Sequence, residues 1–270
     1  MQPIGNSKVR TSRIQGRDFK DIERRFQAAL LQTDWRKPLI RRGVIMNFLR
    51  KLWEIVRKDL TTEFRSKEMI LSMSLFAFLV LIIFGFAFET GFREIENLIP
   101  GILWVAFIFS ALMGLGRSFG SERDGGTLPG LLLCPVSPWS IYLAKMIGTF
   151  IFTAIMEVFA LILLVVLYNQ NLLPYLLPLG LIIFLGTLGF STIGTIFSAM
   201  SSTTKAKDVM LSILVFPISV PLIIASVKAT GIILDGKSFQ TIASWIKILV
   251  AFDLVFLLLA YLTFEFILEE

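Results

Sequence analysis

Six long apolar stretches, separated by shorter polar connections, occupy most of the chain from residue 69 onward. A bilayer core about 30 Å thick requires roughly 20 residues of α-helix to cross it, and each stretch is nearly free of charge over that length. The predicted spans are Met69–Phe88, Leu98–Gly116, Met146–Tyr168, Leu172–Met200, Val209–Leu234 and Thr241–Leu268. The pattern therefore predicts an all-α, polytopic integral membrane protein whose transmembrane domain covers residues 69–270.

Residues 46–68 carry a different pattern, in which apolar side chains recur at helical spacing between basic ones. The apolar positions are Leu49, Leu52, Trp53, Val56, Leu60 and Phe64. This spacing predicts an N-terminal amphipathic helix lying along the membrane interface, with its basic residues at lipid headgroups. The helix is either a simple anchor or also the contact site of a cytoplasmic partner, and the two interpretations are compatible.

The distribution of basic residues predicts the orientation of the spans. Residues 1–67 contain 17 of the 26 lysines and arginines, and the net charge is +6. Because short cytoplasmic connections are enriched in Lys and Arg, we expect both termini to be cytoplasmic. Residues 1–45 read as a basic, flexible arm, either an accessory tail or the product of an upstream start. Membrane lipid is its expected partner rather than nucleic acid, since no nucleic-acid-binding module accompanies it.

Composition limits the chemistry available to this chain. The sequence is 55% hydrophobic, has no histidine and has one cysteine, Cys134, so no internal disulfide can form. Histidine is the commonest general base and metal ligand and a common haem ligand. We expect no catalytic residues and no metal site. An integral-membrane enzyme is the class disfavoured most, because it would need a cluster of acids, a metal set or an activated nucleophile.

One apparent nucleotide-binding motif is better interpreted as a turn. Gly231–Ser238 matches the pattern G-x-x-x-x-G-K-[ST], but a phosphate-binding loop follows a strand and opens a helix. Here the match lies at the end of an apolar span, and Asp235-Gly236 is a typical turn pair. ATP, if it drives this protein, must be bound by another chain.

The connection between the second and third spans, residues 117–138, combines a charged part, a glycine pair and an apolar part. Its notable residues are Arg117, Glu122, Arg123, Asp124, Gly125, Gly126, Leu128, Leu131, Leu132 and Leu133. A short cytoplasmic helix with exposed leucines is a surface that a partner usually covers. The alternative is that the leucines dip into the membrane interface beside the second span.

Two acids are predicted to lie inside the membrane, Glu157 in the third span and Asp253 in the sixth. An ionised side chain at a helix centre costs about 2.5–3.5 kcal/mol on insertion scales. Glu157 therefore has either a role in gating or a structural hydrogen bond to a serine or threonine of a neighbouring helix. In the fifth span, Pro217 and Pro221 lack the N–H of a helical residue and predict a kink.

The fourth span carries Thr187, Ser191 and Thr195 at four-residue spacing, with three glycines beside them. Those glycines are Gly186, Gly189 and Gly194. Small residues let helices approach closely within a membrane. The pattern predicts helix packing, either within one chain or across a homodimer.

Four stretches of this chain resemble the CcmB family, the permease subunit of the haem exporter of cytochrome c maturation. These are "IPGILWVAFIFSALMGLGRSF", "ERDGGTLPGLLLCPVSP", "LAKMIGTF" and "LSILVFPISVPLIIAS", and the resemblance covers roughly residues 47–268. It implies a six-span ABC-2-like permease of the inner membrane, working with a separate CcmA-like ATPase and with CcmC-, CcmD- and CcmE-like proteins.

The same resemblance implies that residues 117–138 contain a coupling helix that seats in the ATPase. It also implies haem as a substrate of the complex. Because the chain has no histidine, we expect it to bind no cofactor directly and the haem ligands to come from partner subunits. Two questions stay open at the level of sequence. The first is whether haem itself crosses or the motor releases a loaded chaperone. The second is whether the cargo is instead a lipid, polysaccharide or drug, as for other ABC-2 exporters.

Overall fold

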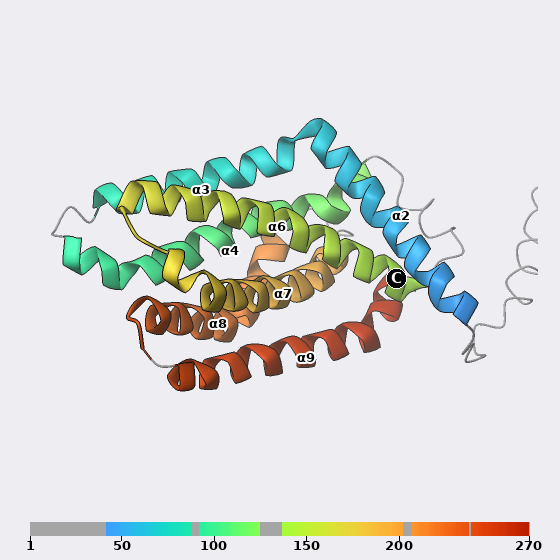
Figure 1. The fold of residues 1–270 in the computed structure, drawn as a ribbon. Coiled ribbons are helices and arrows are strands. Elements are labelled where there is room, and N and C mark those ends of the chain that lie inside the picture. The colour runs from blue at the N-terminus through green and yellow to red at the C-terminus, as the bar shows by residue number, and fades with distance from the viewer. Residues whose placement is uncertain (1–41, 88–91, 125–136, 202–206, 238, 270) are drawn as a thin grey trace, which may run out of the picture. The chain divides into compact units, whose positions relative to one another are not determined.

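The computed structural model describes residues 42–87, 92–124, 137–201, 207–237 and 239–269. Contacts divide the chain into two units, Met1–Ile45 and Met46–Glu270, and the description below concerns the second. Within the described ranges the chain is helical and contains no β-strand. The helices are α2 (Arg42–Ser66), α3 (Glu68–Ala87), α4 (Phe92–Asp124), α6 (Pro138–Tyr168), α7 (Leu176–Ser201), α8 (Lys207–Leu234) and α9 (Phe239–Glu269), with the 3-10 turn η1 (Leu173–Tyr175) before α7 (Figure 1).

Six of these helices are long and apolar enough to cross a membrane, which confirms the predicted all-α, six-span fold. The membrane-crossing candidates are Glu68–Ala87, Asn97–Gly116, Pro138–Tyr168, Leu173–Ser201, Val209–Leu234 and Gln240–Phe264. Most of their boundaries fall within one or two residues of the predicted ones, because the apolar runs end abruptly in charged or polar residues.

Two helices extend further than their apolar runs. α6 begins at Pro138, eight residues before the predicted start of the third span at Met146. Proline suits the first turn of a helix, since its missing N–H would be unpaired there, and the Ser137 hydroxyl caps the turn by accepting from the Ser140 amide at 3.3 Å. α4 continues beyond the span end at Gly116 to Asp124.

Helix α7 lies at the centre of the bundle, where it packs against α4, α6, α8 and α9, while α3 packs against α4 and α6. The glycines of α7 permit this close approach. A Cβ atom on Gly194 would lie 2.4 Å from the Leu115 side chain of α4. Figure 1 shows α7 between α6 and α9, with α3 beyond α6. The polar side chains of α7 therefore face other helices.

The amphipathic segment forms α2, which turns sharply into α3 at Lys67. This residue has φ +59°, in the left-handed region. The Glu63 carboxylate accepts hydrogen bonds from the amides of Met69 at 2.7 Å and Ile70 at 3.1 Å. These amides have no partner inside the first turn of α3, so Glu63 caps α3 from the last turns of α2 and fixes the bend between the two helices (Figure 1).

Candidate functional site

The structure describes the two ends of the predicted coupling segment. The backbone of residues 117–124 continues α4, and α6 resumes at Pro138. Residues 125–136, which include Gly125, Gly126, Leu128, Leu131, Leu132 and Leu133, lie outside the described residues, as do the side chains of Arg117, Glu122, Arg123 and Asp124. The role of this segment stays a prediction.

Helix α2 packs against the first two turns of α6. Ile55 and Val56 form a small apolar cluster with Ile141 and Ala144, and Leu52 packs against it. Near its C-terminal end, the Phe64 ring lies 6.5 Å from the Phe152 ring, centroid to centroid. The predicted apolar face of α2 is thus divided: Val56 is buried in the protein, whereas Leu49 and Trp53 stay exposed and are free to meet lipid.

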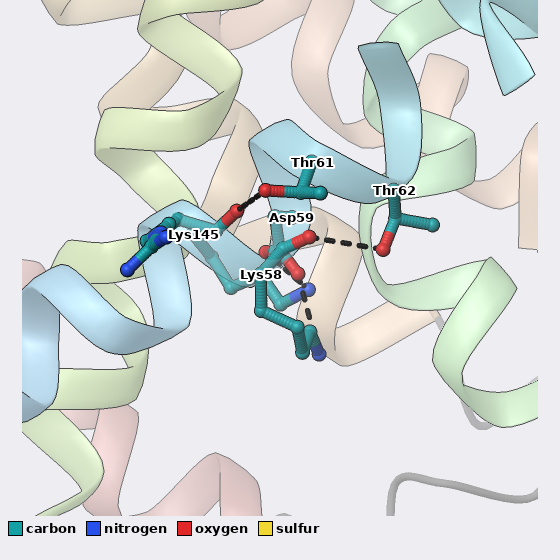
Figure 2. A network of polar contacts seen from close by, with 6 residues as sticks. Lys58, Asp59, Thr61, Thr62 and Lys145 are labelled. Atoms are coloured by element: carbon teal, nitrogen blue, oxygen red, sulfur yellow. Dashed lines mark hydrogen bonds and ion pairs between the residues drawn. The ribbon is translucent and has the colours of Figure 1, made fainter. Parts of the chain in front are cut away.

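An ion pair with little solvent exposure joins the same two helices. The Lys145 ammonium of α6 lies 2.9 Å from Oδ2 of Asp59 on α2, with side-chain exposures of 3% and 16% (Figure 2). Lys58 contacts the other carboxylate oxygen at 3.2 Å. Lys145 lies two turns inside α6, so the start predicted for the third span, at Met146, was wrong.

Two threonines next to this pair bond to the backbone of their own helix. The Thr61 hydroxyl donates to the Arg57 carbonyl and the Thr62 hydroxyl to the Lys58 carbonyl, at 2.7 and 2.9 Å (Figure 2). Their hydrogens are therefore directed away from Asp59. The Asp59 carboxylate contacts the two lysines, and its ion pair with Lys145 links α2 to α6 electrostatically.

Glu157 lies in the interior of the bundle and has a threonine partner. Its two carboxyl oxygens are 2.7 and 2.8 Å from the Thr187 hydroxyl of α7, and both residues are buried. This is the structural hydrogen bond that one of the two sequence interpretations expected. A role for Glu157 in gating stays a prediction.

Asp253 of α9 packs against a different face of α7. Its Oδ1 would lie 2.4 Å from a Cβ atom on Gly189, so only glycine leaves room for the carboxyl. Neither carboxyl oxygen has a hydrogen-bond partner within the described part of the chain, and the residue is buried. The two intramembrane acids are therefore not brought together.

The glycine next along this face, Gly186, accommodates a tryptophan of α4. A Cβ atom there would lie 2.2 Å from the Trp104 ring and 3.1 Å from the Ser226 hydroxyl of α8. Trp104 in turn donates its indole N–H to the Thr230 hydroxyl at 2.9 Å. The small residues of α7 thus accommodate packing within one chain, whereas a homodimer stays a proposal.

The segment that matches the nucleotide-binding pattern is a helix end followed by a turn. α8 ends at Leu234, Gly236 has φ +66°, and the Lys237 ammonium contacts Asp235 at 2.6 Å. A phosphate-binding lysine would instead follow a loop that opens a helix. In the same helix, Pro217 and Pro221 interrupt nothing in the assigned helical run, and the kink that they predict stays a prediction.

Sequence reasoning missed the residues that hold α2 in place, namely Asp59, Glu63 and Ile55. One signal was available for Glu63, an acid shortly before a predicted helix start. Nothing in the sequence pairs Asp59 with Lys145, because the two residues are far apart in the chain and each resembles an ordinary surface charge.

Comparison with known proteins assigns the chain to a family. The sequence profile of the CcmB protein family matches residues 50–269. The chain belongs to the CcmB family. It is 29% identical over 178 residues to heme exporter protein B of Escherichia coli (strain K12), covering 66% of this chain and 80% of that protein.

More distant relatives match over a larger share of the chain. Heme exporter protein B of Pseudomonas aeruginosa is 26% identical over 71% of this chain and 85% of its own length. That of Bradyrhizobium diazoefficiens is 23% identical over 76% and 91%. Together with the six candidate spans, CcmB membership identifies the chain as a multi-pass membrane protein.

Proposed function

We propose that this chain is the membrane permease subunit of a haem exporter that serves cytochrome c maturation. Membership of the CcmB family is the observation that carries the proposal, since relatives matched over most of their length are named heme exporter protein B. The six candidate spans support a subunit that forms a path or a moving element across the membrane.

A separate ATPase chain, similar to CcmA, supplies the energy and docks on residues 117–138. The extension of α4 supports this assignment. The eight residues that follow Gly116, as far as Asp124, extend about 12 Å beyond the apolar span at 1.5 Å per residue. The leucines that follow α4 in the sequence, Leu128, Leu131, Leu132 and Leu133, are the proposed contact of that partner.

Helix α2 is a rigid element that moves together with the docked segment. The start of α6 is bound to α2 through the Ile55–Ile141 cluster and the Asp59–Lys145 pair. A displacement of the docked segment therefore reaches α2 and α6 together. Because Glu63 joins α2 to α3, the same displacement also reaches the first span. Helices α2, α3 and α6 then tilt together when nucleotide binding closes the ATPase.

The remaining partners follow from the same family. The permease works beside CcmC-, CcmD- and CcmE-like proteins in the inner membrane, with both termini on the ATPase side. Haem ligands come from those partners, because this chain has no histidine. Either haem crosses through the permease, which would act as a homodimer, or the motor releases the loaded chaperone.

Affinity purification of the tagged chain in mild detergent tests the proposal. We expect an ATPase and cytochrome-maturation subunits to copurify, and replacing Leu131 and Leu132 by serine should abolish capture of the ATPase. Leu177, 88% exposed near the start of α7, provides a matched control: Leu177→Ser should retain the ATPase. Copurification of lipid- or polysaccharide-export proteins instead would contradict the haem assignment.

A further inference from the structure

A row of buried polar side chains follows one face of α6. Lys145, Thr149, Thr153 and Glu157 recur at four-residue intervals, and all four are buried. Residues four apart lie on the same side of a helix. The row therefore runs for three helical turns through the bundle, from the ion pair with Asp59 to the acid that contacts Thr187.

Helix α7 presents a matching row to α6. Thr187, Ser191 and Thr195 are again four residues apart, and all three are buried. The two helices are antiparallel neighbours, so the Glu157–Thr187 contact fixes their register. Ser191 and Thr195 therefore follow Thr187 toward the α2 end of the bundle, the direction in which Thr153 and Thr149 follow Glu157. The contact between the Thr192 hydroxyl and the Met146 sulfur, at 3.5 Å, agrees with this antiparallel order.

The hydroxyls in the middle of the two rows are the unusual ones. Neither Oγ1 of Thr153 nor Oγ of Ser191 has a hydrogen-bond partner within the described residues, although both side chains are almost fully buried. Threonines and serines inside helices commonly bond to the carbonyl four residues earlier, as Thr195 does to Ser191 at 2.7 Å. Buried polar groups without a protein partner typically bind ordered water.

The contact at the end of the row favours a protonated Glu157. Both carboxyl oxygens lie within 2.8 Å of one Thr187 hydroxyl, which has one hydrogen to donate. A neutral carboxyl satisfies both contacts, because its O–H donates to Thr187 while its carbonyl oxygen accepts. An ionised carboxylate would share that single hydrogen between two oxygens in a buried setting.

We propose that the α6–α7 polar row, formed by Lys145, Thr149, Thr153, Glu157, Ser191 and Thr195, binds a short chain of water molecules through which Glu157 exchanges its proton with the α2 end of the bundle. Protons move along hydrogen-bonded hydroxyls and waters, and Thr153 and Ser191 supply the free hydrogen-bonding positions one turn from the acid. Asp59, which is partly exposed beside Lys145, is the accepting group at the outer end.

On α3, α7 and α9, and on the apolar span of α4, the described acids and lysines lie away from this row. α7 has none, and neither does the described span Asn97–Gly116 of α4. α3 carries Glu68 at its first residue, at the α2 end. On α9, Lys247 is exposed and Asp253 packs against Gly189, on another face of α7 than Thr187. Glu157 is therefore the acid that the row serves.

Infrared spectroscopy of the purified full chain in lipid nanodiscs tests this proposal without relying on haem export or an ATPase. We expect a protonated-carboxyl C=O band that disappears in Glu157→Gln and persists in Asp253→Asn, and that shifts rapidly when H₂O is replaced by D₂O. Thr153→Val combined with Ser191→Ala should slow that shift by about tenfold or more, because the loss of one hydrogen bond along the path raises the barrier to proton transfer.

Matched variants separate a proton path from simple helix packing. Thr153→Ser retains a hydroxyl and should keep the wild-type exchange rate. Ser226→Ala removes an equally buried, unpartnered hydroxyl from α8 and should also leave the rate unchanged. If the double variant fails to fold, Ser191→Ala alone must slow exchange relative to Ser226→Ala. Equal rates in all hydroxyl variants, or a carboxyl spectrum that Glu157→Gln leaves unchanged, would overturn the proposal.

Discussion

The ammonium of Lys145 lies 2.9 Å from the Asp59 carboxylate and joins the amphipathic helix α2 to the start of α6. Both side chains have little exposure to solvent, and Ile55 and Val56 pack beside them. Lys145 lies two turns into α6, the helix that follows the segment to which we assign ATPase docking. The pair therefore bears on both the stability of the chain and the transmission of movement.

Breaking this ion pair should destabilise the protein. Lys145→Met leaves a largely buried carboxylate with a weaker partner, and removing one member of such a pair costs about 3–5 kcal/mol. Because Asp59 is partly exposed, we expect the lower end of that range. Thermal unfolding of the detergent-purified chain measures the loss.

The exchanged pair, Asp59→Lys with Lys145→Asp, is the control for this prediction. It places opposite charges at the same two positions and should recover most of the lost melting temperature, whereas each single reversal should not. If the exchanged variant is no more stable than the single reversals, the contact between α2 and α6 is not electrostatic.

Glu63 should stabilise the bend between α2 and α3. Glu63→Ala removes the acceptor for the Met69 and Ile70 amides, and loss of a helix cap costs about 1 kcal/mol. We expect trypsin to cleave faster after Arg65 and Lys67, and gel electrophoresis measures the rate of this cleavage. Glu63→Gln retains an acceptor oxygen and should be cleaved at nearly the wild-type rate; equal rates in wild type and Glu63→Ala would contradict this role.

Gly186 should tolerate no side chain. A methyl group there would overlap the rigid Trp104 ring at 2.2 Å, and overpacking a core costs about 1–3 kcal/mol. Gly180 lies in the same helix with no atom within 4 Å of an added Cβ. Thermal unfolding should therefore show a lower melting temperature for Gly186→Ala and none of that loss for Gly180→Ala.

Replacing Glu157 by glutamine should leave the fold intact but impair function. The amide fits the same space and still hydrogen-bonds to Thr187, but it cannot release a proton. In cells that carry the variant in place of the wild-type chain, we expect the complex to assemble normally and cytochrome c maturation to fall. Unchanged maturation would remove Glu157 from the mechanism and leave it as a packing residue.

The sequence predicted the spans well because the hydrophobic effect acts on local runs of residues. The prediction failed at the start of α6, because Lys145 interrupts the apolar run and the sequence therefore places the start of the third span at Met146 instead of Pro138. A lysine normally ends a membrane helix, but here the cost of burying it is offset by Asp59, a residue distant in the chain. Likewise, the second span was predicted to end at Gly116, and its helix α4 continues to Asp124 through the charged residues that follow.

The interior polar residues could be named from sequence but not paired. Glu157 and Asp253 were recognisable as acids in apolar runs, and a serine or threonine partner for Glu157 was foreseen in kind. Which hydroxyl it contacts depends on the register of α6 against α7, which is set by side-chain packing along both helices. The same register determines that Gly189 accommodates Asp253.

Cys134, the single cysteine of the chain, lies within the proposed coupling segment and allows the central claim to be tested directly. A photoactivatable maleimide attached to Cys134 in membranes should crosslink to the nucleotide-binding subunit, and the yield should change when ATP is added. Cys134→Ser with Lys237→Cys moves the same probe to the turn after α8, where no such crosslink is expected. Labelling of lipid alone from Cys134, or equal crosslinking from both positions, would contradict the account.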